Sequence, residues 1–364
     1  MNGTVQFASD NYASVHPEVF AAMAAVNVGH DTAYGADATT ADFDRAVQEV
    51  FGRHALGFPV FNGTGANVVS LMALSPRWGG VVASELSHIN VDENGAPERV
   101  GGLKILPVPA PGGRVQLESL SAYVDNMGDE HRAQPLVLSL TQSTELGTVY
   151  SVDQMRALVD AAHAAGMRVH VDGARIANAA AALGVSLLEA CGGADVLSLG
   201  GTKNGAMGAE AVVVLAEDLI ESLSTDLLHL RKATMQLGSK MRFMSAQLIA
   251  LLESRGTDGE PAVDPLWLRN ARHANAMATA LRDELSPLER DGIVRFTQPT
   301  QANAVFVEMP RSLAARVRES YMFYDWQPGT SADTVEVRLM CSWDTQLDHC
   351  KTFVSRVVAD ASAV

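Results

Sequence analysis

Two segments of the chain end apolar runs with residues that can do covalent or proton chemistry. Lys203 stands in a turn of small residues, Gly-Gly-Thr-Lys-Asn-Gly, that follows the apolar run 195–199. Asp172 closes an earlier apolar run, 168–171. A lysine amine can form a Schiff base, and an acid can keep a pyridine nitrogen protonated, and pyridoxal 5′-phosphate (PLP) requires both. The two segments favour a PLP site, with a surface loop lysine as the alternative.

A glycine-rich segment could hold the phosphate of such a cofactor. Phe61-Asn-Gly63-Thr64-Gly-Ala-Asn67 follows an apolar run and precedes an apolar helix over 68–74. Glycines let the backbone approach closely, and free N–H groups at a helix start attract anions. The hydroxyl of Thr64 adds a donor. The segment is neither a Walker loop nor a complete dinucleotide fingerprint, so a plain strand-to-helix turn is an equal alternative.

Two histidines lie near these segments. His88 follows the apolar run 80–84 and could stack on a flat cofactor ring and reach a substrate hydroxyl. On its own, a loop histidine bonded to backbone would be the simpler interpretation, but Lys203 and Asp172 favour the functional one. His170 points to the same strand face as Asp172, because side chains alternate along a strand, and is expected to pack beneath the site.

Two arginines could bind a carboxylate. Arg175 follows Asp172 by three residues, within reach of a carboxylate or phenolate, or else lies on a helix surface. Arg338 lies in the alternating segment 335–340, on the face opposite Val337 and Leu339. The planar fork of arginine binds both oxygens of a carboxylate. An exposed strand arginine is the alternative for Arg338.

Composition limits the class of protein. The chain has 364 residues, 47% hydrophobic and 19% charged, which predicts a large core and two domains. The net charge of −15 argues against nucleic acid and anionic membranes as partners. No apolar stretch reaches the roughly 18 residues of a membrane helix, and no signal peptide is visible. Cys191, Cys341 and Cys350 form neither a metal-type pair nor an even disulfide set, which favours a reducing cytoplasm and no metal site.

Alternating apolar and helical patterns predict an α/β fold with a mainly parallel, seven-stranded sheet. The expected strands are 59–61, 80–84, 104–108, 136–140, 168–171, 195–199 and 211–215, and the expected helices include 37–51, 151–165 and 176–183. The division is expected to be a large domain, 1–245, and a smaller α+β domain, 246–364. The second contains a polar loop over 253–261, a helix over 267–285 and strands over 304–309 and 335–340.

Taken together, these segments resemble the L-threonine aldolase family, low-specificity type, in the fold-type I group of PLP enzymes that includes β-eliminating lyases. The resemblance covers most of the chain. The segments that carry it are 8–12 (Ala-Ser-Asp-Asn-Tyr), 29–37 (Gly-His-Asp-Thr-Ala-Tyr-Gly-Ala-Asp), 61–67, 87–88, 170–175 (His-Val-Asp-Gly-Ala-Arg), 201–205, 240–243 and 338–344.

The resemblance implies a role for each matched residue. Lys203 would carry PLP as a Schiff base, and Asp172 would pair with its ring nitrogen. His88 would stack on the ring and, directly or through a bound water, act as the base that takes the proton of the substrate β-hydroxyl. Gly63 and Thr64 would bind the phosphate. Ser9, Arg175 and Arg338 would hold the substrate carboxylate, and Arg175 would also lie near the phenolic oxygen of the cofactor. Arg242 and Tyr34 would be donated across a subunit interface of a dimer or tetramer, Arg242 toward the cofactor.

The implied reaction cleaves the Cα–Cβ bond of a β-hydroxy-α-amino acid, giving glycine and an aldehyde. Many members carry Asn-Thr-His-Asn where this chain reads Leu140-Thr-Gln142-Ser-Thr-Glu145, so Gln142 is expected to replace a histidine and cannot act as a base. Aromatic substrates such as phenylserine, β-elimination and racemisation remain alternatives. So does a non-catalytic PLP-binding protein. A nicotinamide-dependent enzyme is disfavoured, because no Gly-x-Gly-x-x-Gly opens a first βα unit.

Overall fold

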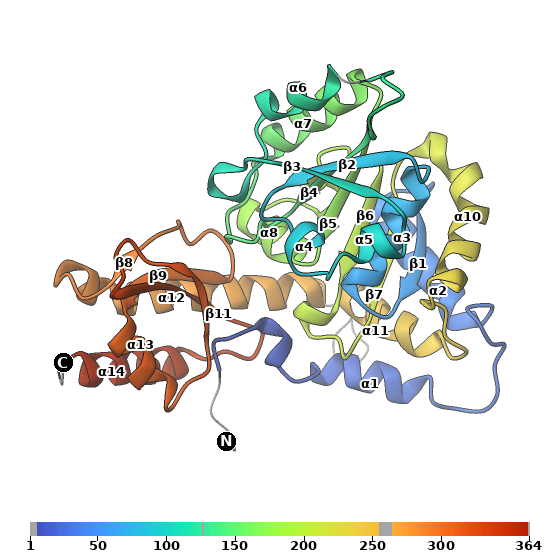
Figure 1. Ribbon diagram of the computed structural model, residues 1–364. Helices are drawn as coiled ribbons and strands as arrows, with labels where there is room; N and C mark the ends of the chain where they lie inside the picture. The colour runs from blue at the N-terminus through green and yellow to red at the C-terminus, as the bar shows by residue number, and fades with distance from the viewer. Residues whose placement is uncertain (1–5, 126, 255–263, 363–364) are drawn as a thin grey trace.

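The computed structural model describes residues 6–125, 127–254 and 264–362, arranged around two sheets (Figure 1). The larger sheet has seven strands in the order β1-β7-β6-β5-β4-β2-β3. Its strands are β1 (Leu56–Val60), β2 (Gly79–Ser84), β3 (Lys104–Val108), β4 (Gln134–Thr141), β5 (Arg168–Gly173), β6 (Val196–Gly200) and β7 (Glu210–Val214). Only β7 runs against its neighbours; β2 to β6 pair in parallel, so the expected mainly parallel sheet is confirmed.

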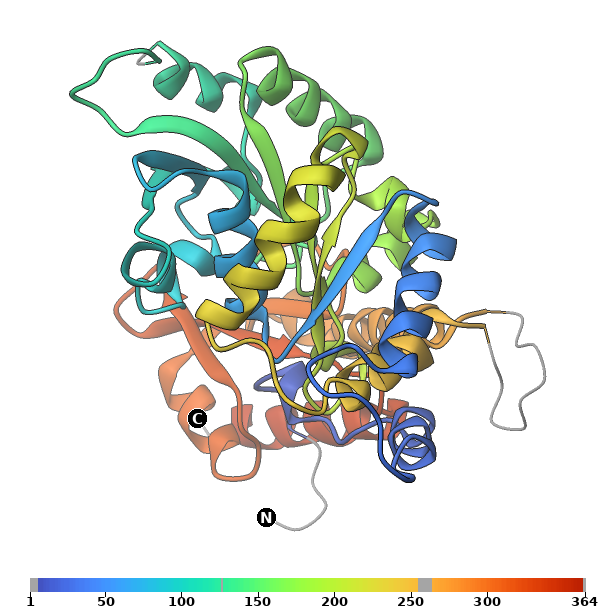
Figure 2. The same ribbon diagram turned by 90° about the vertical axis from the view of Figure 1, so that its right-hand side faces the viewer.

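Helices cover both faces of this sheet, which explains why its strands are near-continuous apolar runs. Val212 and Val214 pack with α3 (Gly63–Leu74) and α10 (Ile220–Ala233) on one face, and Figure 2 shows α10 in yellow across it. Val213 faces the opposite core with the other helices. These are α2 (Ala38–Phe51), α7 (Val152–Ala164), α8 (Ile176–Leu183), α9 (Leu187–Ala190) and α11 (Arg242–Leu252).

Helix starts follow the capping signals in the sequence. The side chain of Asp37 accepts a hydrogen bond from Thr40 N at 2.8 Å, before α2. Ser151 and Gln154 form a reciprocal capping box at the start of α7. The remaining short elements are α4 (His88–Val91), α5 (Ala96–Arg99), α6 (Leu117–Val124), η2 (Pro111–Gly113), η3 (Thr202–Asn204) and η4 (Glu217–Leu219).

The smaller sheet has four antiparallel strands in the order β10-β11-β9-β8. These are β8 (Arg295–Phe296), β9 (Ala304–Pro310), β10 (Tyr324–Pro328) and β11 (Thr334–Met340), packed with α13 (Arg311–Arg318) and α14 (Leu347–Ala361). The long helix α12 (Leu266–Arg290) contacts α8 in the larger part and α14 in the smaller, and so joins the two (Figure 1). The division predicted at 245/246 falls inside α11 and stays a prediction.

The N-terminal segment crosses from the small part to the large one. Phe7 pairs through its backbone with Met322 (N to O, 3.1 Å) and with Met340 (O to N, 2.8 Å), and its ring lies 4.9 Å from that of Phe353. The chain then forms η1 (Asp10–Tyr12) and α1 (Pro17–Ala25), which packs on α11. The start of the chain is therefore built into both parts.

Across the three described ranges, none of the helices combines the length and the apolar character needed to cross a bilayer. The longest, α12, is amphipathic, with its apolar side buried by α8 and α14. Of the polar loop expected over 253–261, residues 255–261 lie outside the described residues.

Candidate active site

A cavity of about 280 Å³ opens at the carboxyl ends of β4, β5 and β6, the edge where α/β sheets bind ligands. Six of the expected site residues line it: Gly63, Thr64, His88, Asp172, Arg175 and Lys203. The other lining residues are Asn11, Phe61, Asn62, Asn67, Glu93, Thr141, Ser143, Glu145, Ala174, Thr202, Gly208 and Glu210. The structure thus gathers at one place side chains that are far apart in the sequence.

Lys203 lies in η3, in the turn between β6 and the antiparallel strand β7. Glu210 fixes this turn, because its carboxylate accepts hydrogen bonds from Gly201 N at 2.8 Å and from Thr202 N at 3.3 Å. Burial, together with the positive charge of Arg175, lowers the pKa of Lys203. A buried amine with a lowered pKa is neutral more often, and only the neutral amine is a nucleophile. The surface-lysine interpretation is wrong.

Asp172 ends β5 with both carboxylate oxygens bound. Asn67 of α3 donates to Oδ2 at 2.9 Å, and Ala174 N donates to Oδ1 at 3.0 Å. Burial acts to raise the pKa of Asp172, but the Ala174 N–H and the charge of Lys203 outweigh it, so the pKa is lowered. The carboxylate is therefore ionised at neutral pH. The amide of Asn67, which sequence reasoning did not single out, orients it.

His88 begins α4 and its ring is paired with a buried acid. Nδ1 lies 2.9 Å from Oε1 of Glu93, and that same oxygen accepts from the Asn67 amide at 2.9 Å. The hydrogen bond to Glu93 raises the pKa of His88 against the opposing effect of burial. Asn67 thus ties Asp172 and the His88–Glu93 pair into one network. A histidine with a raised pKa stays protonated to a higher pH, so a smaller fraction of its rings is free to take a proton from a substrate.

His170 lies beneath Asp172, on the same face of β5. It is fully buried, with Nδ1 2.9 Å from the Ser139 hydroxyl and Nε2 2.8 Å from the Ser198 hydroxyl. Burial lowers the pKa of His170 to about 4, so the ring is neutral. It does not line the cavity and supports Asp172 from below, as the strand alternation indicated.

The start of α3 offers an anion site. Asn62 caps the helix by accepting from Gly65 N at 2.7 Å. The N–H groups of Gly63 and Thr64 occupy the first two helical positions, where no carbonyl of a preceding turn can accept them. A Cβ at Gly63 would meet no atom within 4 Å, so this residue faces open space. Backbone donors and the positive end of the helix dipole both point into the cavity.

Arg175 is bound to Asp10, an acid whose role the sequence alone does not indicate. Its Nε and Nη2 donate to Asp10 Oδ2 and Oδ1 at 2.7 and 2.8 Å, and Asn303 donates to the same carboxylate at 3.0 Å. Burial alone would raise the pKa of Asp10, but Arg175 overcomes it and lowers the pKa to about 2. Arg175 lies in the cavity lining as expected, with Nη1 as the nitrogen not engaged by Asp10.

Arg338 and Ser9 lie beside the cavity lining. The Arg338 guanidinium stacks 4.7 Å from the centre of the Trp326 ring and donates to Ala8 O at 3.3 Å. Its Nε is shielded from solvent and has no partner among the described residues. Burial, and then the charge of Arg175, lower the pKa of Arg338 to about 10. Two guanidinium groups that repel each other across this edge, close to Ser9, are disposed to receive an anion.

Tyr34 and Arg242 lie outside the cavity of their own chain. Tyr34 is 54% exposed, with positive φ, and its N–H donates to Ser239 O at 3.0 Å. Arg242 starts α11, with its guanidinium 5.1 Å from the centre of the Phe243 ring. Neither lines the cavity.

Gln142 does not occupy the cavity. It is fully buried and holds the backbone of Tyr150, donating to its carbonyl at 3.0 Å and accepting from its N–H at 3.2 Å. The side chains of this loop that do line the cavity are Ser143 and Glu145. The resemblance predicted that Gln142 takes the place of the family's histidine. In the structure, Gln142 lies outside the cavity lining, whereas Glu145 of the same loop belongs to it.

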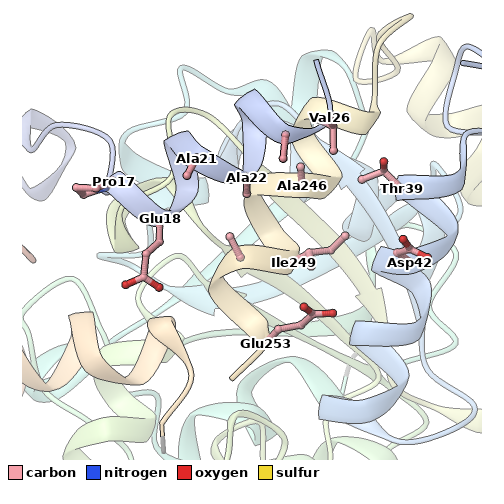
Figure 3. Close-up of a pocket in the computed structure, with 12 residues that line it drawn as sticks. Pro17, Glu18, Ala21, Ala22, Val26, Thr39, Asp42, Ala246, Ile249 and Glu253 are labelled. Carbon is pink, nitrogen blue, oxygen red and sulfur yellow. The ribbon is translucent and has the colours of Figure 1, made fainter. Parts of the chain in front are cut away.

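A larger hollow of about 610 Å³ lies between α1, α2 and α11 (Figure 3). Small apolar side chains line it, together with Glu18, Asp42 and Glu253, and none of the expected site residues does. Because the Lys203 amine, the Asp172 carboxylate and the anion site at Gly63 and Thr64 are all at the smaller cavity, the chemistry belongs there.

Comparison with known proteins gives consistent matches. The model of the family described as beta-eliminating lyase matches residues 6–310. A low specificity L-threonine aldolase of Pseudomonas aeruginosa is 37% identical over 353 residues, 96% of this chain and 95% of that one. Alanine racemase TOXG of Cochliobolus carbonum is 30% identical over 260 residues, 70% of this chain and 64% of that one. A solved structure of Leishmania major threonine aldolase is 25% identical, covers 98% of this chain and 99% of that one, and has a TM-score of 0.87.

Proposed function

The chain belongs to the beta-eliminating lyase family, and we propose that it cleaves threonine-type β-hydroxy-α-amino acids to glycine and an aldehyde with the help of PLP. The observation that carries the proposal is the single cavity that unites a buried lysine, an ionised carboxylate and an open helix N-terminus. Each of these three features serves a different part of PLP: the aldehyde, the ring nitrogen and the phosphate.

The donor set of the cavity fits PLP. Lys203 supplies an amine of lowered pKa for the cofactor aldehyde, and the anionic Asp172 supplies a partner for a protonated ring nitrogen. Gly63 and Thr64 supply backbone donors, and the Thr64 hydroxyl adds another, for the phosphate. His88 would cover a face of the ring. When bound, PLP supplies an electron sink for the charge that develops at Cα.

The residues beside the cavity account for the choice of an amino acid as substrate. Arg338 and the free Nη1 of Arg175 bear positive charge close to the hydroxyl of Ser9, and would hold the substrate carboxylate between them. A carboxylate held at two points fixes the rotation of the substrate, and so selects which bond at Cα is aligned for cleavage. Asp10 holds Arg175 in position for this contact and leaves its Nη1 unengaged.

A homo-oligomer with shared active sites completes the proposal. Arg242 and Tyr34 stay outside the cavity of their own chain, as residues that serve a neighbouring subunit would. Apolar side chains also stand exposed near the cavity mouth: Met207 next to Gly208 is 53% exposed, and Phe61 is 37% exposed. A second copy packed over this mouth would bury them and add its Arg242. The three cysteines are free and buried, which supports a reducing compartment such as the cytoplasm.

Racemisation is the second candidate reaction, because a relative at 30% identity bears the name alanine racemase. Racemisation needs the same lysine and acid but breaks the Cα–H bond and needs no group to accept a hydroxyl proton. The two reactions therefore differ in their products. Cleavage releases an aldehyde, whereas racemisation changes only the stereochemistry of the amino acid.

The test incubates the purified holoenzyme with L-threonine, L-allo-threonine and phenylserine, and measures acetaldehyde or benzaldehyde together with glycine. Parallel samples with L-alanine are analysed by chiral chromatography. We expect aldehyde and glycine in equal amounts from at least one β-hydroxy amino acid. Conversion of L-alanine to D-alanine without any aldehyde would replace the aldolase proposal by the racemase one.

A further inference from the structure

Glu145 reaches into the cavity from the loop that follows β4. Its Oε1 accepts hydrogen bonds from the backbone N–H of His88 and from the Thr141 hydroxyl, both at 2.9 Å. Its Oε2 is shielded from solvent and has no hydrogen-bond partner among the described residues. One oxygen thus fixes the carboxyl group in place, beside His88, and the other is left over for a ligand.

The remaining carboxylates of the cavity are committed to other contacts. Both oxygens of Asp172 are bound, by Asn67 and by Ala174 N, and both oxygens of Glu210 accept from the lysine turn. Glu93 keeps one oxygen unpaired, but its charge is shared with the His88 ring. Glu145 is the cavity carboxyl that combines a fixed position, a free oxygen and no cationic side chain hydrogen-bonded to it.

On the basis of the aldol cleavage proposed above, we propose that Glu145 is a catalytic residue that accepts the proton of the substrate β-hydroxyl through Oε2. The O–H bond breaks and its proton passes to Oε2, while the C–O single bond becomes the C=O of the aldehyde. The electron pair of the Cα–Cβ bond stays with Cα. Oε2 then releases this proton to solvent, and Cα takes a separate proton from solvent to give glycine, so the carboxylate is regenerated and the balance closes.

The surroundings of Glu145 suit this exchange. Burial, with a further contribution from the negative charge of Asp172, raises its pKa to about 7, against the effect of the Thr141 and His88 donors. The Arg175 guanidinium and the Tyr150 phenol also interact with it electrostatically, and Lys203, His88, Glu93 and Glu210 line the same cavity. A base acts best when its pKa lies near the working pH. Because the ionised form is the base, the activity it supports rises as the pH increases through about 7.

The first test is Glu145→Gln, which keeps an oxygen for the His88 N–H and the Thr141 hydroxyl but removes the basic carboxylate. We expect kcat for cleavage to fall about 100-fold or more, the usual contribution of a general base. Exchange of the glycine Cα proton with D₂O, followed by NMR, needs no hydroxyl and should continue at the wild-type rate. Glu145→Asp should restore part of the cleavage activity. Glu85→Gln, at an exposed glutamate, is the matched control and should behave like wild type.

The second test follows the carboxyl group itself, without turnover. Infrared difference spectra of wild type minus Glu145→Gln, recorded across pH, should show a carboxylic-acid C=O band that disappears as the pH rises through about 7. The subtraction is needed because burial also raises the pKa of Asp44, to about 6, and that group titrates nearby. This readout applies with or without the cofactor.

The outcomes separate the two proposals. Wild type that cleaves no β-hydroxy amino acid ends the proposed function, whatever the infrared band does. Wild type that cleaves, with Glu145→Gln cleaving equally well, overturns the role of Glu145 alone. Equal loss of cleavage and of glycine exchange in Glu145→Gln also overturns it, because the carboxylate would then only hold the His88 loop.

Discussion

Asp10 and Arg175 meet through two parallel hydrogen bonds of 2.7 and 2.8 Å, which join the N-terminal segment to the end of β5. Asn303, just before β9, donates to the same carboxylate at 3.0 Å. One buried acid therefore connects three parts of the chain beside the cavity. The pair neutralises part of the charge of Arg175, and Asp10 does not engage the third guanidinium nitrogen, Nη1, of this cavity-lining residue.

Asp10→Asn should destabilise the protein, because it leaves the Arg175 charge buried without its partner. Breaking a buried ion pair costs about 3–5 kcal/mol. The measurement is urea unfolding at pH 7, with Asp283→Asn on the exposed side of α12 as the control. An unfolding midpoint for Asp10→Asn equal to that of the control would contradict the prediction.

Lowering the pH should remove the stabilisation that ionised Asp10 gives to the wild-type protein. The folded-state pKa of Asp10, about 2, lies below its ordinary value of 3.8, so its stabilisation is complete above pH 4 and disappears as the pH falls toward 2. The linked free energy is about 2 kcal/mol. The gap in unfolding free energy between wild type and Asp10→Asn should narrow over that range, and a gap that stays constant would refute the linkage.

Lys203→Ala should abolish covalent attachment of PLP, because no other amine of the cavity lining can form the Schiff base. The check is borohydride reduction of the holoprotein followed by peptide mass spectrometry. Wild type and Lys351→Ala, a change on the exposed side of α14, should both carry the label at residue 203. A label on any other lysine would require a different site.

Arg338→Ala should impair substrate use while PLP stays bound, because the Arg338 guanidinium lies beside the cavity rather than in its lining. Loss of a hydrogen bond to a charged group costs about 1.5–3 kcal/mol, which is roughly a ten- to hundredfold fall in kcat/KM. Arg290→Ala, at the exposed end of α12, is the control. Unchanged kcat/KM for Arg338→Ala would exclude it from the carboxylate contact.

Mixing inactive Lys203→Ala subunits with Arg242→Ala subunits should restore activity if the site is shared. A mixed dimer contains one site with Lys203 from one subunit and Arg242 from the other, both intact. The variants are unfolded together, refolded and assayed for aldehyde. The same experiment with Lys203→Ala and Asp172→Asn should stay inactive, because both residues line the cavity of one chain. No recovery in the first mixture would show that Arg242 acts within its own subunit.

Gln142→Ala should change stability more than chemistry. The Gln142 amide binds the backbone of Tyr150 through both of its polar atoms, and unpairing buried groups costs about 1–3 kcal/mol each. Thermal unfolding should therefore occur at a lower temperature, with kcat near the wild-type value. A large fall in kcat without loss of stability would restore Gln142 as an active-site residue.

The sequence was sufficient to predict which residues lie together at the cavity where helices and strands position them. Lys203, Asp172 and His88 follow strands whose apolar runs are visible in the sequence, and the carboxyl ends of parallel strands meet at one edge. Helix starts were equally readable, because caps such as Ser151 act within one turn.

The features that could not be predicted from the sequence depend on contacts between distant segments. The alternation of β4 ends at Thr141, so it gives no information on whether Gln142 or Glu145 faces the cavity; the loop path decides that. The pairing of Asp10 with Arg175 joins residues far apart, and nothing local signals it. Strand β10 was missed because its residues are mostly exposed and lack an apolar alternation.

The contacts of Phe7 and Asp10 have a consequence for how the protein folds during its synthesis. Phe7 and Asp10 leave the ribosome long before their partners, Met340, Phe353 and Asn303, are synthesised. The segment that contains Phe7 and Asp10 therefore stays without these contacts until the partners have been synthesised. A translation product that ends before residue 303 would contain Lys203, Asp172 and the Asp10–Arg175 pair, but would lack the Asn303 amide that holds Asp10 beside the cavity.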